Sequence, residues 1–560
     1  MSGFVEVRGP ADVVRVFGAD GEIPVHRTPD GLWSGDGVVV GLVAEPGRLG
    51  VRLVASVGVA RVQLRWHGDV GAGTRYLGDH WERSYGDLEW HGEAAERVLP
   101  WYVLTCSDPA GPGAPAGSAD GGTQGVTHGY GVRVGAGALC FWTADARGLS
   151  LWADVRSGGR PVLLGGRALA VADVVAHIGE PGETPFEAHR ALCRAMCPEP
   201  LLPDHPVYGT NDWHVHYGRN SFEVIARAAD QVSQLSPDAG NRPYCVIDDG
   251  WSRGGLGSGP WYGNERFGDM DVMAQRLRDL GTRPGIWYRP LTTLPGVPSR
   301  WLLEGRGCLD PSRPEVLELV GEHLRRLVAW GYELVKHDFT TFDVLGRWGF
   351  AMGATGTDDG WGFARGDLTT AEVLTDLYRT IRAGAGTGAL LIGCNTVGHL
   401  AAGLVELQRI GDDTSGVSWN RTRRMGVNTL AFRAAQHGTF FAVDADVTPV
   451  TPDLPWALAR QWLELVAASG TPLFVSVSPQ VTDPAVLSVV GEALALAARP
   501  APVAEPLDWF DTRCPRRWRL GSGGGSDGGG VVGGVVGAVG IERSFDWLGA
   551  DSAGAWPFGD

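Results

Sequence analysis

The feature that most constrains the fold is a regular alternation of short apolar runs with amphipathic helical stretches across residues 207–500. The apolar runs are 207–213, 242–251, 283–290, 332–339, 389–395, 406–413, 440–447 and 472–479. The helical stretches are 222–235, 272–281, 314–331, 371–384, 429–438, 456–470 and 484–500. Strand–helix alternation predicts parallel βα units, and eight units over about 290 residues match a (β/α)8 TIM barrel. A doubly wound open sheet is disfavoured because no G-x-G-x-x-G follows a strand and no P-loop occurs.

The flanking regions have a different pattern. Short β-type runs separated by Gly, Pro and Asp, such as 61–66, 101–106 and 149–155, predict an antiparallel β-sandwich. We therefore divide the chain into an N-terminal β-sandwich domain (1–200), a catalytic α/β barrel (201–500) and a small C-terminal β segment (501–560). Within these regions, 108–125 is predicted to be a surface loop, and 521–540 is a glycine-rich, low-complexity loop.

Composition excludes several partners. The chain carries 48 Lys+Arg against 64 Asp+Glu, a net charge of −16, and no dense basic run, so nucleic acid and anionic membrane are not expected partners. The first residues lack the features of a secretory signal, and no run of about 18 apolar residues occurs. Eight cysteines without a CxxC pair favour a reduced, cytoplasmic protein. The sequence leaves a homo-oligomer open.

Polar and aromatic residues gather where the predicted barrel strands end, which is where TIM-barrel active sites lie. In chain order they are Asn211, Asp212, Trp213, Asp248, Asp249, Trp251, Trp287, Arg289, Lys336, Asp338, Cys394, Asn395, Arg409, Asp412, Asp413, Asp444 and Asp446. Carboxylates and an ammonium group hydrogen-bond sugar hydroxyls, and indole rings cover the apolar face of a pyranose. The pattern therefore predicts a carbohydrate pocket.

Lys336 is the only lysine in the chain, which singles it out because arginine cannot replace a compact ammonium among ligand oxygens. Lys336 and Asp338 lie two residues apart on one strand and share a face. An adjacent positive charge keeps an aspartate ionised, as a nucleophile requires. By the same parity Arg409 shares a face with Asp413, whereas Asp412 would point elsewhere if the strand stays extended. Two facing carboxylates are the minimum apparatus for glycoside hydrolysis.

Each of these residues also has a structural interpretation. Lys336 and Asp338 could form a buried ion pair, and Asp248–Asp249 before a glycine could be a turn. Arg409 could neutralise an acidic rim, and the tryptophans could be core residues. The D-x-D spacing of Asp444 and Asp446 could indicate a metal, but no His or Glu accompanies it, so structural hydrogen bonding is favoured.

Three motifs in order, VIDDGW, LVKHDF and RIGDDTS, resemble the α-galactosidase clan of retaining glycosidases, families 27 and 36. Family 36 is the more similar because its members also place a β-sandwich before the barrel and a small β domain after it. The resemblance implies that Asp338 is the nucleophile and Asp413 the acid/base. It implies that Lys336, Asp248 and Asp249 bind sugar hydroxyls and that Cys394 lines the pocket. It implies no metal or organic cofactor.

The sequence departs from family 36 at several points. Strand three ends in Trp-Tyr-Arg-Pro rather than in an acidic segment, so Arg289 could favour an anionic or differently substituted sugar. Asn395-Thr396-Val397 replaces a glycine-rich turn. Before the barrel, the segment containing Trp81 and Trp90 could reach the pocket mouth, although core packing is favoured for both residues.

The sequence therefore predicts a retaining exo-α-glycosidase acting on terminal α-galactosides or a related α-linked sugar. Substrate-binding candidates are Asp248, Asp249, Lys336, Trp213, Trp251, Trp287, Cys394, Asn395 and Arg409. The alternatives are an α-galactosyl transferase similar to raffinose synthases, a lyase that forms a Schiff base on Lys336, and a non-catalytic carbohydrate-binding barrel.

Overall fold

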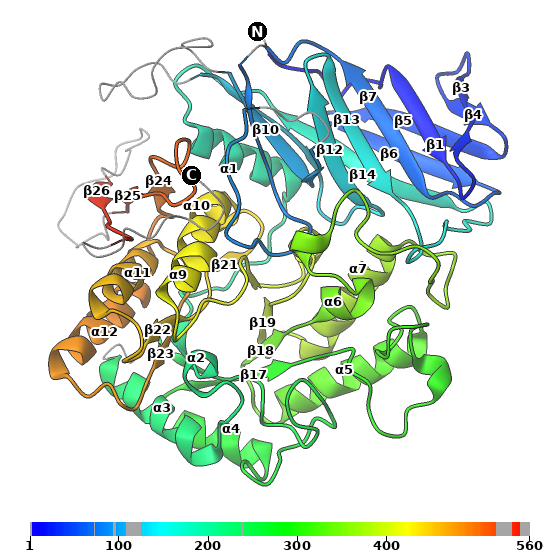
Figure 1. The fold of residues 1–560 in the computed structure, drawn as a ribbon. Helices are drawn as coiled ribbons and strands as arrows, with labels where there is room; N and C mark the ends of the chain where they lie inside the picture. Colours follow the sequence, from blue (N-terminus) through cyan, green and yellow to red (C-terminus); the bar gives the residue numbers. More distant parts are fainter. Residues whose placement is uncertain are drawn as a thin grey trace.

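A computed structural model describes residues 3–71, 73–92, 97–107, 125–236, 240–521 and 540–548. A β-sandwich, blue to cyan in Figure 1, lies against a barrel of parallel strands and helices, green to orange. The predicted fold class is confirmed. The predicted surface loop 108–125 and the glycine-rich loop 521–540 lie outside the described residues apart from their end residues 125, 521 and 540.

The barrel is a nine-stranded sheet in the order β21-β20-β19-β18-β17-β16-β15-β23-β22, and every neighbouring pair is parallel. The strands are β15 (Tyr208–Asn211), β16 (Tyr244–Ile247), β17 (Arg283–Tyr288), β18 (Leu334–His337), β19 (Leu390–Gly393), β20 (Leu407–Arg409), β21 (Ala442–Asp444), β22 (Thr448–Val450) and β23 (Leu473–Val477). All eight predicted runs contain a strand.

The ninth strand, β22, was not predicted, because it begins at Thr448, directly after the seventh predicted run ends at residue 447. The strand inside that run, β21, pairs with β20, whereas β22 pairs with β23. Between them Asp446 adopts a left-handed backbone conformation with φ of 73°, which breaks the extended strand. The break lets one segment join both ends of the sheet and so close the barrel.

Helices cover the outside of the barrel. They are α2 (Trp213–His216), α3 (Phe222–Leu235), α4 (Met270–Asp279), α5 (Pro314–Ala329), α6 (Thr340–Leu345), α7 (Thr370–Ala385), α8 (Gly398–Ala401), α9 (Trp419–Thr422), α10 (Thr429–Arg433), α11 (Trp456–Ala468) and α12 (Pro484–Ala497), with short helical turns at η1 (Ser299–Trp301), η2 (Gly349–Ala351), η3 (Arg423–Asn428) and η4 (Ala434–Gln436). The start of α7 is fixed by a capping box, in which Thr369 and Glu372 bond each other's backbone N–H.

The sandwich consists of two antiparallel sheets and one helix. The first sheet contains β1 (Val13–Phe17), β2 (Glu22–Ile23), β7 (Arg61–His67), β9 (Leu99–Pro100), β12 (Leu139–Asp145) and β13 (Gly148–Asp154). The second contains β3 (His26–Arg27), β4 (Trp33–Gly35), β5 (Val38–Glu45), β6 (Arg48–Ala55), β8 (Arg75–Gly78), β10 (Tyr102–Cys106), β11 (Thr127–Val132) and β14 (Ala168–His177). Helix α1 (Pro185–Met196) packs on β11 and β14 and leads toward the barrel.

A small antiparallel sheet follows the barrel. It pairs β24 (Glu505–Pro506) with β25 (Arg517–Leu520), and β25 with β26 (Ile541–Ser544). Among the described residues, no helix combines the length and apolarity needed to span a bilayer.

Candidate active site

The carboxyl ends of the parallel strands bring most of the predicted residues together. Asp248 follows β16 and accepts hydrogen bonds at Oδ2 from Asn211 Nδ2, at the end of β15, and from Lys336 Nζ on β18, both at 2.7 Å. Burial alone would lower the pKa of Lys336, but Asp248 and the other acidic groups around it, including Asp338, together outweigh burial, and the pKa is raised. The ammonium group is therefore fixed and charged.

Asp338 lies directly after β18, and both of its carboxylate oxygens are held. Oδ1 accepts from the backbone N–H of Phe339 at 2.7 Å and of Asn395 at 3.0 Å. Oδ2 accepts from Trp287 Nε1 at 3.1 Å. Three N–H donors stabilise the ionised carboxylate and fix its plane, which suits a nucleophile.

Two carboxyl groups beside Asp248 retain protons more tightly than ordinary aspartates. Burial and the charge of Asp248 raise the pKa of Asp249 to about 7, and the same causes raise that of Asp212 to about 7. Asp249 accepts from the backbone N–H of Gly250 and of Gly257, each at 2.7 Å. Asp212 accepts from the Asp248 N–H at 2.7 Å and so orients Asp248 and Asp249, the acidic pair that follows β16.

Arg409 is buried and touches three carboxylates: Asp444 at 3.1 Å, Asp446 at 2.5 Å and Asp413 at 3.2 Å. The Asp413 side chain is 37% exposed, whereas that of Asp446 is 2% exposed. Burial and the charge of Asp446 act to raise the pKa of Asp413, whereas Arg409, Arg83 and His214 act to lower it, and the pKa lies below its ordinary value. Asp413 is the carboxylate of this group that reaches the mouth.

Asp412 is engaged elsewhere. Its two oxygens bind Arg83 Nη2 at 2.9 Å and Arg421 Nη2 at 2.7 Å. Because β20 ends at Arg409, strand parity does not extend to residues 412 and 413. The two side chains have different ion-pair partners, and both oxygens of Asp412 are occupied by arginines rather than available for proton transfer.

Behind Arg409, Asp446 is the centre of a buried network. Its Oδ2 accepts from Thr414 N at 2.6 Å and Thr414 Oγ1 at 2.9 Å, and lies 3.0 Å from His214 Nε2. Asp444 and Asp446 both bind Arg409 rather than facing a common metal position. In the part of the chain that the structure describes, no group of three or more His, Cys, Asp or Glu side chains could hold a metal ion.

The predicted aromatic residues have different surroundings. Trp287 donates to Asp338, and Trp251 donates to the Trp287 carbonyl at 2.9 Å with its side chain fully buried, so Trp251 presents no face to a sugar. Trp213 is half-buried and packs edge-on against Tyr217. Cys394 is buried, and burial raises the pKa of its thiol, which keeps it protonated and unreactive.

The expectation that Arg289 favours an anionic sugar finds no support in its contacts. Arg289 Nε donates to Asp343 Oδ2 at 3.0 Å and Nη2 to Oδ1 at 2.5 Å. Its guanidinium also lies over the Phe339 ring, 4.3 Å from the centroid. A bidentate pair with a buried carboxylate neutralises Arg289, so its charge is not free for a substrate.

Sequence reasoning missed Glu82 and Arg83, which the 79–88 segment of the sandwich domain carries to the barrel mouth. The prediction considered only the tryptophans, and Trp81 and Trp90 are core residues, 4% and 5% exposed. Two adjacent charged residues between buried aromatics were the only signal in the sequence.

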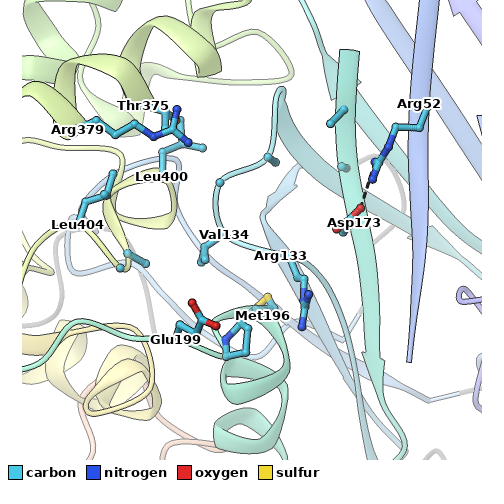
Figure 2. A pocket seen from close by; sticks show the side chains of 17 residues that line it. Arg52, Arg133, Val134, Asp173, Met196, Glu199, Thr375, Arg379, Leu400 and Leu404 are labelled. Atoms are coloured by element: carbon cyan, nitrogen blue, oxygen red, sulfur yellow. Dashed lines mark hydrogen bonds and ion pairs between the residues drawn. The ribbon is translucent and has the colours of Figure 1, made fainter. Parts of the chain in front are cut away.

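A cavity of about 400 Å³ lies between the sandwich and the barrel (Figure 2). Residues from β6, β14 and α7 line it, and Arg52 pairs with Asp173 at one side, at 3.2 Å. It contains none of the strand-end carboxylates and is distinct from the candidate active site.

The fold and the strand-end cluster define a class of protein: a TIM barrel behind an N-terminal β-sandwich, with aspartates after the carboxyl ends of its strands. No family model matches this chain, and no curated protein matches it in sequence. Solved structures do match in fold, and α-galactosidases are among them.

An α-galactosidase from Thermus thermophilus, in complex with p-nitrophenyl α-D-galactopyranoside, matches with a TM-score of 0.58 and 20% identity over 89% of this chain and 98% of that chain. A family 36 α-galactosidase from Geobacillus stearothermophilus, in complex with 1-deoxygalactonojirimycin, matches with a TM-score of 0.57 and 14% identity, over 91% of this chain and 77% of that chain. The galactosidase domain of an α-galactosidase–sucrose kinase matches with a TM-score of 0.59 and 14% identity, over 91% of this chain and 78% of that chain. The chain therefore has the fold of family 36 α-galactosidases.

Proposed function

We propose that this protein is a retaining exo-α-glycosidase that hydrolyses terminal α-galactosides or a closely related α-linked sugar. The observation that carries the proposal is the pair of unlike carboxylates at one barrel mouth. Asp338 is held by three N–H donors, and Asp413 is partly exposed beside Arg409. The fold likeness to α-galactosidases supports the choice of sugar.

In the first half of the reaction, Asp338 Oδ attacks the anomeric carbon while Asp413 gives its proton to the leaving oxygen. The C–O bond to the leaving group breaks, and a β-glycosyl ester of Asp338 forms. In the second half, Asp413 takes a proton from water, whose oxygen attacks the anomeric carbon and releases Asp338. The product has the α-configuration of the substrate.

The proton on Asp413 is required only when the sugar is bound. In the free protein Arg409 and Arg83 favour the carboxylate. A sugar seated at the mouth displaces water from Asp413, and desolvation raises a carboxyl pKa. The same group then acts as the base in the second half.

The ion pair of Lys336 and Asp248 supports hydroxyl recognition rather than Schiff-base chemistry. An amine whose pKa is raised stays protonated and is not a nucleophile. Asp248, Asp249 and Lys336 together offer acceptors and donors for vicinal hydroxyls. With Arg289 neutralised by Asp343, a neutral sugar fits this charge distribution.

The test is release of nitrophenol from a panel of aryl α- and β-glycosides by the wild type beside Asp338→Asn, with deamidation excluded. We expect cleavage of the α-galactoside by the wild type alone, with ¹H NMR showing retained configuration. Wild-type-like activity in the variant would overturn the assignment of Asp338. Cleavage only when a sugar acceptor is added would identify a transferase. Binding of a sugar without cleavage would identify a carbohydrate-binding protein.

A further inference from the structure

The 79–88 segment fixes part of the sandwich domain to the barrel mouth. Ser84 N donates to Ile410 O and Asp412 N donates to Ser84 O, each at 2.9 Å, so the segment runs beside the end of β20. Asp79 binds Arg433 at 2.6 Å on the barrel side. Glu82 is thereby held at the ends of β18 and β19.

Glu82 is a buried carboxylate, 2% exposed, surrounded by donors. Oε1 accepts from Gly349 N at 2.8 Å and from the Tyr85 hydroxyl, and Oε2 accepts from Asn395 Nδ2. An ionised carboxylate only accepts, whereas a glutamine would turn its NH2 group toward one of these donors. Burying a carboxylate is costly unless it is hydrogen-bonded. Burial raises the pKa of Glu82, and the Tyr85 hydroxyl and the Gly349 N–H act to lower it, so these donors offset part of that cost.

Asn395 links Glu82 to the proposed nucleophile. Its side chain is held at both ends, because Nδ2 donates to Glu82 and Oδ1 accepts from Phe342 N at 2.8 Å. Its backbone N–H donates to Asp338 Oδ1 at 3.0 Å. The direction of that N–H depends on how the Asn395 side chain is anchored, and Glu82 supplies one of the two anchors.

We propose that Glu82 is a positioning residue for Asp338, an inference that rests on the proposed function. It acts through Asn395, 313 residues away in sequence, and does not touch the substrate. The sandwich domain thus completes the support of the attacking carboxylate, and the site is built by two domains rather than by the barrel alone.

The experiment compares Glu82→Gln with Asp79→Asn in the full chain. Asp79 is the matched control, since it is a buried carboxylate of the same segment that bonds Arg433 and Gln436 but not Asn395. The readouts are kcat and KM on the aryl α-galactoside, and the rate at which 5-fluoro-α-galactosyl fluoride labels Asp338, followed by intact mass.

We expect Glu82→Gln to lower kcat and the labelling rate together by about 10- to 100-fold, because small misplacement of a reacting group has effects of this order. KM should change little, and Asp79→Asn should stay close to the wild type. Equal loss in both variants would overturn the proposal, because loosening of the domain contact would then explain the effect. A wild-type labelling rate in Glu82→Gln would overturn it as well.

A second variant covers the case in which Glu82→Gln folds poorly. Asn395→Ala removes the same hydrogen bond from the other side and keeps the backbone N–H. In a double-mutant cycle the losses from the two positions should be non-additive, and additive losses would overturn the proposal. A silent wild type would overturn the proposed function and this inference with it, whereas an active wild type beside an equally active Glu82→Gln overturns this inference alone.

Discussion

The two carboxylates at the barrel mouth are held in opposite ways. Asp338 accepts three N–H donors and is 9% exposed. Asp413 pairs with Arg409 at 3.2 Å and is 37% exposed. A nucleophile must stay ionised and aligned, so rigid donors suit it. An acid/base must gain and lose a proton in each cycle, so fewer fixed partners and access to water suit it. The difference in support corresponds to the difference in proposed role.

Replacing the rigid carboxylate should have the largest effect. We expect Asp338→Ala to lower kcat/KM by at least about 10³-fold, since removing a hydrolase nucleophile abolishes most of its rate enhancement. Azide should then restore turnover and give a β-glycosyl azide by direct displacement. Product stereochemistry by NMR is the measurement, and an α-glycosyl azide would contradict the assignment.

Replacing the exposed carboxylate should have a smaller effect that depends on the leaving group. We expect Asp413→Ala to lower kcat/KM by about 10²- to 10⁴-fold on natural disaccharides, which need acid assistance, and by less on nitrophenyl glycosides. Azide should here attack the glycosyl-enzyme and give an α-glycosyl azide. Asp412→Ala is the matched control, and it should retain the wild-type dependence on leaving group.

The support of Asp413 can be altered without touching the residue itself. The charge of Asp446 acts to raise the pKa of Asp413, so Asp446→Asn should lower that pKa. The basic limb of the kcat–pH profile should then move to lower pH by about one unit. Thr414→Val removes a hydrogen bond from Asp446 but keeps its charge, so its limb should stay in place. A shift toward higher pH in Asp446→Asn would contradict this network.

The smallest effect concerns the stability of the fold at acidic pH. Measuring it shows whether a loss of activity at low pH comes from titration of the catalytic carboxylates or from unfolding. Burial lowers histidine pKa values from 6.5 to about 3 at His323 and His337 and to about 4 at His189, His399 and His437. Below pH 6.5 these histidines bind protons in the unfolded chain but stay neutral in the folded protein. The free energy of unfolding therefore falls as the pH falls.

Asp212 and Asp249, with pKa values raised to about 7, oppose this trend because the folded state binds their protons first. The five histidines outnumber them. The melting temperature should therefore fall between pH 7 and pH 5 in calorimetry. A constant or rising melting temperature would contradict this prediction. Any loss of activity at low pH would then have to come from titration of the carboxylates.

Much of the fold and part of the site followed from the sequence. The period of apolar residues predicted eight of the nine strands of the barrel sheet, because βα units are local patterns of burial. Strand parity favoured Asp413 over Asp412, but β20 ends at Arg409, so the different ion-pair partners of the two side chains do not follow from an extended strand. Lys336 stood out as the sole lysine, and it pairs with Asp248.

Contacts between distant residues could not be predicted. Arg289 suggested an anionic substrate until its pairing with Asp343 removed the free charge. Trp251 and Trp287 were both predicted to cover a sugar, yet both rings are buried and pack against Trp261, because tertiary packing rather than position near a strand end decides which rings are exposed.

The sequence by itself determined where the strands end and which chemical groups stand there, since both depend on residues close in the chain. Only the tertiary structure decided how those groups are held. The break in the seventh strand places Asp446 against Arg409, His214 and Thr414, and the 79–88 segment brings Glu82 to Asn395. A hydrogen bond across 313 residues leaves no local pattern, because only packing of the two domains brings its donor and acceptor together.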